Sequence, residues 1–191
     1  MLLDHGRHRA IASPPPTIER SETIERSELT LAVERATDVP RPLVGDALAE
    51  AAAIWQPLGV SLTWRFVEAG DRGASPDELR LVVSDDVSES GNETRLGWIR
   101  FPAPATPEGI VHLSREAARR LLGTALSVRQ KPLAWQDTLL ARAMGRALAH
   151  EIGHYLLASE LHSTRGLMRS TFSVDALTGV ARAGFALSNV G

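Results

Sequence analysis

The sequence predicts an α+β protein in which helices pack against one sheet. Segments with the period or composition of strands all precede residue 115, and the longest segment with helical periodicity follows them. Strands followed by helices in this way are typical of the α+β class. Apolar residues make up 43% and charged residues 23% of the 191 residues, which is the balance of a globular domain with a sizeable core.

Residues 1–28 predict a low-complexity tail, and residues 29–191 predict one folded domain. The tail contains three consecutive prolines and two copies of the hexad Thr-Ile-Glu-Arg-Ser-Glu, at residues 17–22 and 23–28. Two copies are too few for a repeat fold, and polar sequence of this kind is typical of disorder. The first residues lack the apolar segment of a signal peptide, so none is expected, and the compartment is left open.

The first part of the domain predicts a strand, a helix and a second strand. Leu29–Val33 has the composition of a strand. An apolar-periodic helix is expected over Leu43–Trp55, because two prolines precede it and a proline and a glycine end it. Val60–Val67 alternates between apolar and polar residues, as a half-buried strand does.

Two further strands are expected, at Glu78–Val83 and at Gly109–Leu113. Between them lies a polar stretch rich in glycine and proline, Ser84–Pro107, which the apolar segment Leu96–Phe101 interrupts.

Two helices follow the last strand. Ser114 is placed to cap a short helix over Arg115–Leu122, with Glu116 in its first turn. A long helix is expected from Trp135 to Ala158. Its apolar residues recur at three- and four-residue steps: Leu139, Leu140, Ala143, Met144, Ala147, Leu148 and Ile152.

Charge and cysteine content exclude several kinds of partner and site. The net charge of -2 gives no basic field for nucleic acid or an anionic membrane. No segment reaches the roughly 18 apolar residues of a membrane span. Because the chain has no cysteine, histidine and carboxylate are the metal ligands that remain. We expect a monomer with no nucleic-acid or membrane partner.

The long helix carries His150-Glu-Ile-Gly-His154, a match to the H-E-x-x-H pattern. Residues four apart differ by about 40° around a helix and by about 6 Å along it. The imidazoles of His150 and His154 can therefore converge on one metal ion. Glu151 lies beside them, where its carboxylate can take a proton from a metal-bound water.

A catalytic zinc site normally has three protein ligands and one open position. His162 is the first choice for the third ligand, because it lies past the expected helix end, where the chain can turn back. Asp175, 21 residues beyond His154, is the alternative.

The segment His150–Ser163, followed by Gly166-Leu167-Met168, resembles the active-site segment of the metzincin metallopeptidases. That family has two histidines on a helix, a third after a turn, and then a tight turn bearing methionine. The resemblance implies that His150, His154 and His162 bind one catalytic Zn²⁺. It further implies that Glu151 is the general base and that Met168 supports the site in a Met-turn.

The resemblance also implies a zincin-like fold, with a mixed sheet whose edge strand precedes the active-site helix. The edge strand would be Gly109–Ser114, and Val111, His112 and Leu113 would bind the substrate. The chain departs from the family in its third histidine, which follows His154 by eight residues rather than about six. No glycine lies between them, so either the turn is wider than in the family, or Ala158 or Ser159 adopts the turn conformation.

These observations predict a zinc-dependent metalloendopeptidase that hydrolyses a peptide or protein substrate through a zinc-bound water activated by Glu151. Two alternatives stay open. The first is a zincin with Asp175 as third ligand, similar to the regulatory proteases that cut repressors. The second is a non-catalytic protein that zinc stabilises.

Overall fold

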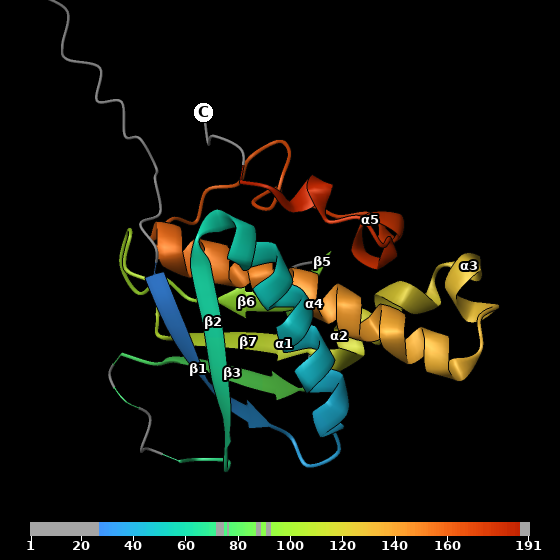
Figure 1. The fold of residues 1–191 in the computed structure, drawn as a ribbon, viewed down its shortest axis with the longest axis horizontal. Coiled ribbons are helices and arrows are strands. Elements are labelled where there is room, and N and C mark those ends of the chain that lie inside the picture. The colour runs from blue at the N-terminus through green and yellow to red at the C-terminus, as the bar shows by residue number, and fades with distance from the viewer. Residues whose placement is uncertain (1–26, 72–74, 76, 87–88, 91–92, 188–191) are drawn as a thin grey trace, which may run out of the picture.

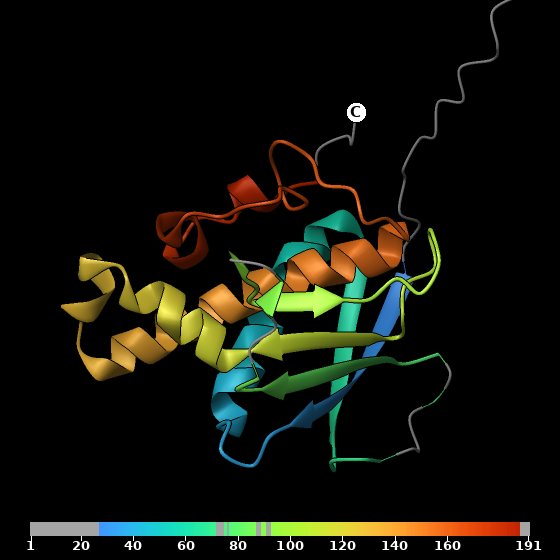
Figure 2. The ribbon, with the colours of Figure 1, turned by 180° about the vertical axis from the view of Figure 1, so that it is seen from behind.

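The computed structural model describes residues 27–71, 75, 77–86, 89–90 and 93–187. They form an α+β domain with a five-stranded, mostly parallel sheet (Figure 1). Seen from behind, the sheet lies in front of helices α1 and α4, which cover one of its faces (Figure 2). The predicted tail lies outside the described residues, except for Ser27 and Glu28, which begin the first strand.

The predicted elements are confirmed, with ends that agree within two residues. The strands are β1 (Ser27–Arg35), β2 (Val60–Val67), β3 (Leu79–Ser84), β4 (Glu89–Ser90), β5 (Glu93–Thr94), β6 (Gly97–Ile99) and β7 (Ile110–Ser114). The helices are α1 (Arg41–Trp55), α2 (Arg115–Gly123), α3 (Leu126–Arg129), α4 (Leu133–Leu157) and α5 (Val174–Thr178), with 3₁₀ turns at Gln56–Leu58 and Ala183–Phe185.

The strand order β2-β1-β3-β7-β6 corrects the prediction of the edge strand. Strand β7 pairs with β3 in parallel on one side and with β6 in antiparallel on the other. The edge nearest α4 is therefore β6, from the apolar segment that interrupts the polar stretch. Both neighbours of β7 are strands of the sheet, so the prediction that β7 is the edge strand is wrong. A substrate strand therefore cannot pair beside Val111, His112 and Leu113 as that prediction implied.

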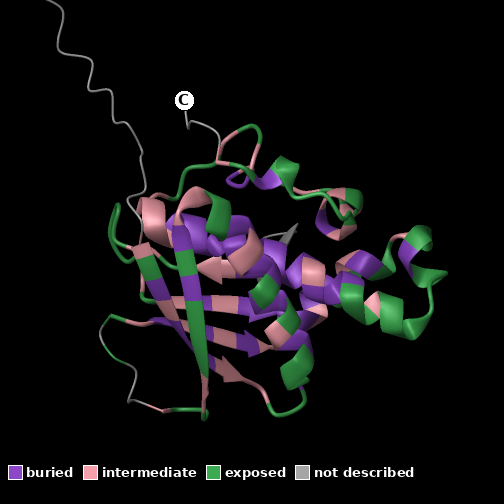
Figure 3. Cartoon of the chain, viewed as in Figure 1, coloured by how far each residue is buried: buried purple, intermediate pink, exposed green. Residues whose placement is uncertain are grey.

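The core lies between the sheet and the pair α1 and α4 (Figure 3). On β3 the alternate residues Leu79, Leu81 and Val83 are fully buried, whereas the residues between them are partly exposed. The opposite face of the sheet is polar: the Thr30 and Thr63 hydroxyls lie 3.0 Å apart there. This alternation is typical of a sheet covered on one side.

Helices α1 and α4 approach closely because α4 carries a glycine at the crossing. A Cβ at Gly145 would lie 2.5 Å from the Ala47 carbonyl oxygen and 2.6 Å from the Glu50 Cβ. Further along, the buried Trp55 indole donates to the Ala149 carbonyl oxygen at 3.1 Å. These contacts fix α4 directly before His150.

Beyond β7 the chain forms α2 and α3 before it enters α4. The Ser114 hydroxyl accepts a hydrogen bond from the Ala117 N–H, so the predicted cap of α2 is confirmed.

Among the described residues, no helix is both long enough and apolar enough to cross a membrane.

Candidate metal centre

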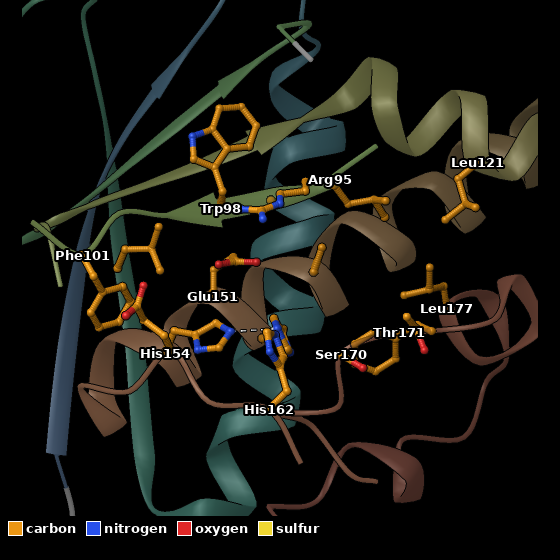
Figure 4. A pocket seen from close by; sticks show the side chains of 17 residues that line it. Arg95, Trp98, Phe101, Leu121, Glu151, His154, His162, Ser170, Thr171 and Leu177 are labelled. Carbon is orange, nitrogen blue, oxygen red and sulfur yellow. Dashed lines mark hydrogen bonds between the residues drawn. The ribbon is translucent and has the colours of Figure 1, made fainter. Parts of the chain in front are cut away.

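His150 and His154 lie one turn apart on the buried part of α4, and their rings converge (Figure 4). Their Nε2 atoms are 3.0 Å apart. The ring planes are nearly perpendicular, at 87°, with the centroids 4.6 Å apart. The convergence predicted from the H-E-x-x-H spacing is present in the structure.

The other nitrogen of each ring is hydrogen-bonded to the backbone. His150 Nδ1 lies 2.8 Å from the Leu167 carbonyl oxygen, and His154 Nδ1 lies 2.6 Å from that of Ser159. A carbonyl oxygen only accepts, so each Nδ1 donates and carries the hydrogen. In a neutral ring Nε2 is then a bare acceptor, which is the tautomer that a metal ligand needs.

Two Nε2 lone pairs that face each other can be satisfied by a proton or by a metal ion between them. A proton is disfavoured there, because burial lowers the pKa of His150 to about 4 and also lowers the pKa of His154. A divalent metal ion satisfies both lone pairs at once. The pair is therefore oriented for metal binding rather than for a hydrogen bond between the rings.

His162 brings a third imidazole to the same point. Its ring is stacked on that of His150, with the centroids 5.2 Å apart, and nearly perpendicular to that of His154. One ligand nitrogen from each of the three rings lies within 4.8 Å of the others. Ligand nitrogens on one zinc ion with Zn–N bonds of about 2.0–2.1 Å would be about 3.3 Å apart, which lies between the 3.0 Å of the helix pair and the 4.8 Å limit of the cluster.

The turn that returns the chain to the site uses an alanine in the left-handed conformation. Ala158 has φ 46° and ψ 43°, and the N–H of Ser159 donates to the His154 carbonyl oxygen. Of the alternatives predicted for a turn without glycine, the structure shows an alanine in the left-handed conformation, at Ala158. The loop closes where the Ser163 N–H donates to the Met168 carbonyl oxygen at 2.8 Å.

Asp175 does not reach the histidines. It lies in the first turn of α5 and is exposed. In the part of the chain that the structure describes, the group of side chains able to hold a metal ion consists of His150, His154 and His162.

Glu151 is buried between α4 and the start of β6. Burial raises the pKa of Glu151 to about 8, and both the Arg95 charge and a hydrogen bond from the Ile99 backbone oppose this rise. A Cβ at Gly97 would lie 3.0 Å from the Glu151 Cγ, so the absence of a side chain on β6 makes room for this glutamate.

Met168 lies beneath the same turn of α4. It is fully buried, and a Cβ at Gly153, between the two ligand turns, would collide with its sulfur. Trp55 packs against Gly153 as well, with Cζ2 3.6 Å from that Cβ position. Met168 therefore contacts the helix that carries the ligands, and its supporting role stays a prediction.

The histidines and Glu151 share a cavity of about 700 Å³. Its other lining residues come from β6 and its flanks, from α2 and α4, and from the C-terminal segment: Arg95, Leu96, Gly97, Trp98, Ile99, Phe101, Leu121, Ala147, Glu160, Ser170, Thr171, Phe172 and Leu177. Val111, His112 and Leu113 do not line it. Val111 and Leu113 are buried in the core, and the ring of His112 stacks on Trp98, with the centroids 4.9 Å apart.

Sequence reasoning missed Arg95, Gly97 and Ile99 as residues of the site. The apolar segment Leu96–Phe101 was the available signal, because an apolar run within a polar stretch indicates a buried element.

Comparisons with protein-family models and with curated proteins give no match. Among solved structures, the chain is similar to the crystal structure of archaemetzincin from Methanopyrus kandleri. The two are 13% identical in sequence, the match covers 79% of this chain and 86% of that one, and the TM-score is 0.49.

Proposed function

We propose that this chain is a zinc-dependent metallopeptidase. The observation that carries the proposal is the convergence of three imidazole nitrogens beside a buried carboxylate, within one open cavity. Each ring of the helix pair is held in the tautomer that a metal requires.

The donor set fits zinc. His150, His154 and His162 would hold the ion, and three histidine nitrogens with one remaining position are typical of catalytic zinc. When bound in such a site, zinc supplies Lewis-acid polarisation of a carbonyl and of a water molecule, whose pKa falls from about 15.7 towards 7.

Glu151 carries the proton during hydrolysis. A carboxylate oxygen takes a proton from the attacking water as the new C–O bond forms. Glu151 then gives this proton to the leaving amide nitrogen as the C–N bond breaks, which regenerates the carboxylate. The Arg95 charge and the Ile99 hydrogen bond favour the carboxylate that accepts the proton, and burial favours the protonated form that holds it until the second transfer.

Strand β6 offers the backbone groups for an extended peptide. The Ser114 N–H donates to the Leu96 carbonyl oxygen, so Leu96 and Ser114 form a hydrogen-bonded antiparallel pair. Hydrogen bonding alternates along an antiparallel pair, so the backbone groups of Gly97 and Ile99 point away from β7. The Ile99 N–H is hydrogen-bonded to Glu151, so a peptide can add to this edge through the backbone groups of Gly97 and the Ile99 carbonyl.

The predicted alternatives have less support. The described residues bring His162, not Asp175, to the helix pair. A purely structural zinc site has four protein ligands and needs no base, whereas this site has three histidines, an adjacent Glu151 and an open cavity.

Replacing Glu151 by Gln tests the proposal. We expect one zinc per chain in both proteins, because Glu151 is not a ligand, and a fall in turnover of roughly 10²–10⁴-fold in the variant. Zinc is measured by elemental analysis, and cleavage by mass spectrometry of an unfolded protein substrate. Native turnover by the Glu151→Gln variant, or wild-type protein that binds no zinc, would contradict the proposal.

A further inference from the structure

Arg95 places a permanent positive charge in the cavity. It precedes β6, is exposed, and is the one Lys or Arg among the described residues that line the cavity. Among the residues whose side chains the structure describes, which leave out 87–94, its guanidinium has no hydrogen-bond or ion-pair partner. An arginine that supports the fold would have carbonyl or carboxylate partners, as Arg115 does with Asp38 and Asp85.

The charge of Arg95 reaches the centre of the site. In Figure 4 its side chain extends between Trp98 and Glu151. The cavity lining also contains two carboxylates, Glu151 and Glu160, so Arg95 is the source of positive charge among its Lys and Arg positions.

The positive charge of Arg95 lies on one side of Glu151. Figure 4 shows Arg95 on the same side of Glu151 as Leu121 and Leu177, with Phe101 and His154 on the other side. Arg95 stands before Gly97, the first residue of β6, and Phe101 stands after its last residue. A peptide paired with β6 would therefore meet this positive charge at the end of the strand that Gly97 begins.

The direction of pairing decides which part of the peptide meets Arg95. Antiparallel pairing is the more stable arrangement per residue. A peptide antiparallel to β6 runs from the Phe101 end towards the Arg95 end. Its residues on the C-terminal side of the cleaved bond then lie next to Arg95 and the apolar wall formed by Leu121 and Leu177.

We propose that Arg95 forms a subsite for a substrate carboxylate on the C-terminal side of the cleaved bond. This inference rests on the proposed peptidase function. The carboxylate has two possible sources, an acidic side chain or the free C-terminus of a short peptide, and both have the same chemistry for a guanidinium. Because Arg95 is exposed, we expect a preference of roughly tenfold rather than absolute selection.

The test first locates cleavage sites in an unfolded protein by mass spectrometry, and then uses synthetic peptides that span one site. The peptides differ only after the cleaved bond: they carry Asp, Asn or Lys, each with a free or an amidated C-terminus. We expect wild-type protein to favour either Asp over Asn or the free acid over the amide by about tenfold in kcat/KM. A preference for Asp over Asn identifies an acidic side chain as the source of the carboxylate, and a preference for the free acid over the amide identifies the C-terminus.

Variants of Arg95 test its part in this preference. Arg95→Gln should reduce the preference to about onefold, and Arg95→Glu should favour the Lys peptides. Arg100→Gln is the matched control, because Arg100 is an exposed arginine that follows β6 and does not line the cavity. It should keep the wild-type preference.

Affinity provides a readout that does not require turnover. In the Glu151→Gln background, fluorescence anisotropy of labelled peptides should give a Kd about tenfold lower for the favoured carboxylate, and Arg95→Gln should remove the difference. Equal affinity for all peptides, no measurable binding of any peptide, or the same loss of preference in Arg100→Gln would overturn the subsite. Zinc content and the loss of turnover in Glu151→Gln report separately on the peptidase function.

Discussion

His150 and His154 each use Nδ1 for a hydrogen bond to a backbone carbonyl and leave Nε2 available to a metal ion. The carbonyl that holds His150 belongs to Leu167, and the adjacent Met168 carbonyl holds the loop that carries His162. One short segment therefore orients both the first and the third ligand. The arrangement resembles the backbone support that metal-binding histidines commonly receive.

Removing the third ligand should weaken the zinc site without affecting the helix pair. In His162→Ala we expect zinc affinity to fall by at least roughly 100-fold, because two ligands remain. Asp175→Ala is the control and should bind zinc as the wild type does, since Asp175 lies outside the cluster. The Kd is measured by competition with a chromogenic chelator. Loss of zinc in Asp175→Ala alone would favour the carboxylate-ligand alternative.

The buried histidines should make the metal-free protein sensitive to acid. Burial lowers the pKa of His150 to about 4, below its ordinary value of 6.5. Between these values the unfolded chain binds a proton that the folded chain does not, so stability falls as pH falls from 6.5 to 4. The full shift corresponds to roughly 3 kcal/mol in the free energy of unfolding. The pKa values of His154 and His162 are also lowered, and these residues act in the same direction.

Glu151 contributes a pH dependence of stability with the opposite sign, so the measurement uses a variant that lacks its carboxyl group. Its pKa is raised to about 8, so the folded state binds a proton more readily than the unfolded state, and acid stabilises the protein through this group. Urea unfolding is therefore followed from pH 7 to pH 5 in chelator-treated Glu151→Gln, with and without His150→Gln. The second substitution should flatten the pH dependence. Equal slopes in the two proteins would contradict the prediction.

At the scale of elements, the end of α4 determines where the third ligand can lie. The left-handed Ala158 lets Ser159 return to the helix, and the Ser159 carbonyl then orients the His154 ring. Ala158 thus ends the helix and begins the loop to His162, and its neighbour Ser159 orients the ring of His154.

Ala158→Gly should stabilise the protein. The left-handed conformation is unfavourable by about 1–2 kcal/mol for a residue with a Cβ, and glycine removes this strain. Glycine also increases the conformational entropy of the unfolded chain, which offsets part of the stabilisation. We expect a net increase of about 0.5–1 kcal/mol in the free energy of unfolding, measured by denaturant titration of the zinc-loaded protein. Ala134→Gly, at an exposed helical position of α4, should instead destabilise by about 1 kcal/mol.

Sequence reasoning succeeded where the signal is local. The helix with its two ligands, the strands β1, β2 and β3, and the turn at Ala158 all follow from periodicity and spacing within short segments. The edge of the sheet does not, because strand order depends on pairing between distant segments. Strand β6 has three residues, Gly97–Ile99, too few to show a period, and the edge predicted at Gly109–Ser114 rests on the family resemblance alone.

At the scale of the whole molecule, a buried ion pair joins the helix layer to the C-terminal segment. Arg146, one turn before His150, donates to Glu50 on α1 at 3.0 Å. It also donates to the carbonyl oxygens of Ala176, Gly179 and Ala181. That segment provides Leu177 to the cavity wall. Glu50 and Arg146 are 96 residues apart, and no local pattern predicts their pairing.

Arg146→Met should destabilise the protein and loosen the cavity wall. The substitution removes one partner of a buried ion pair and leaves three carbonyl oxygens without this donor, for which a loss of roughly 3–5 kcal/mol is expected. Arg182 still donates to Glu50 at 3.0 Å, so the lower part of this range is the better expectation. Arg146→Lys keeps the positive charge but lacks the several N–H donors of the guanidinium. Its loss of unfolding free energy should therefore be intermediate.

Arg142→Met is the matched control for this network. Arg142 lies one turn earlier on α4, is only partly buried, and donates to the Thr178 carbonyl oxygen, so its loss should be about 1 kcal/mol. Unfolding by denaturant gives the stabilities, and limited proteolysis reports on the segment after His162. Because Arg146 binds that segment at three carbonyl oxygens, proteolysis there should increase more in Arg146→Met than in Arg142→Met. Equal stability losses and equal proteolysis in the two variants would show that the buried pair does not hold the C-terminal segment against α4.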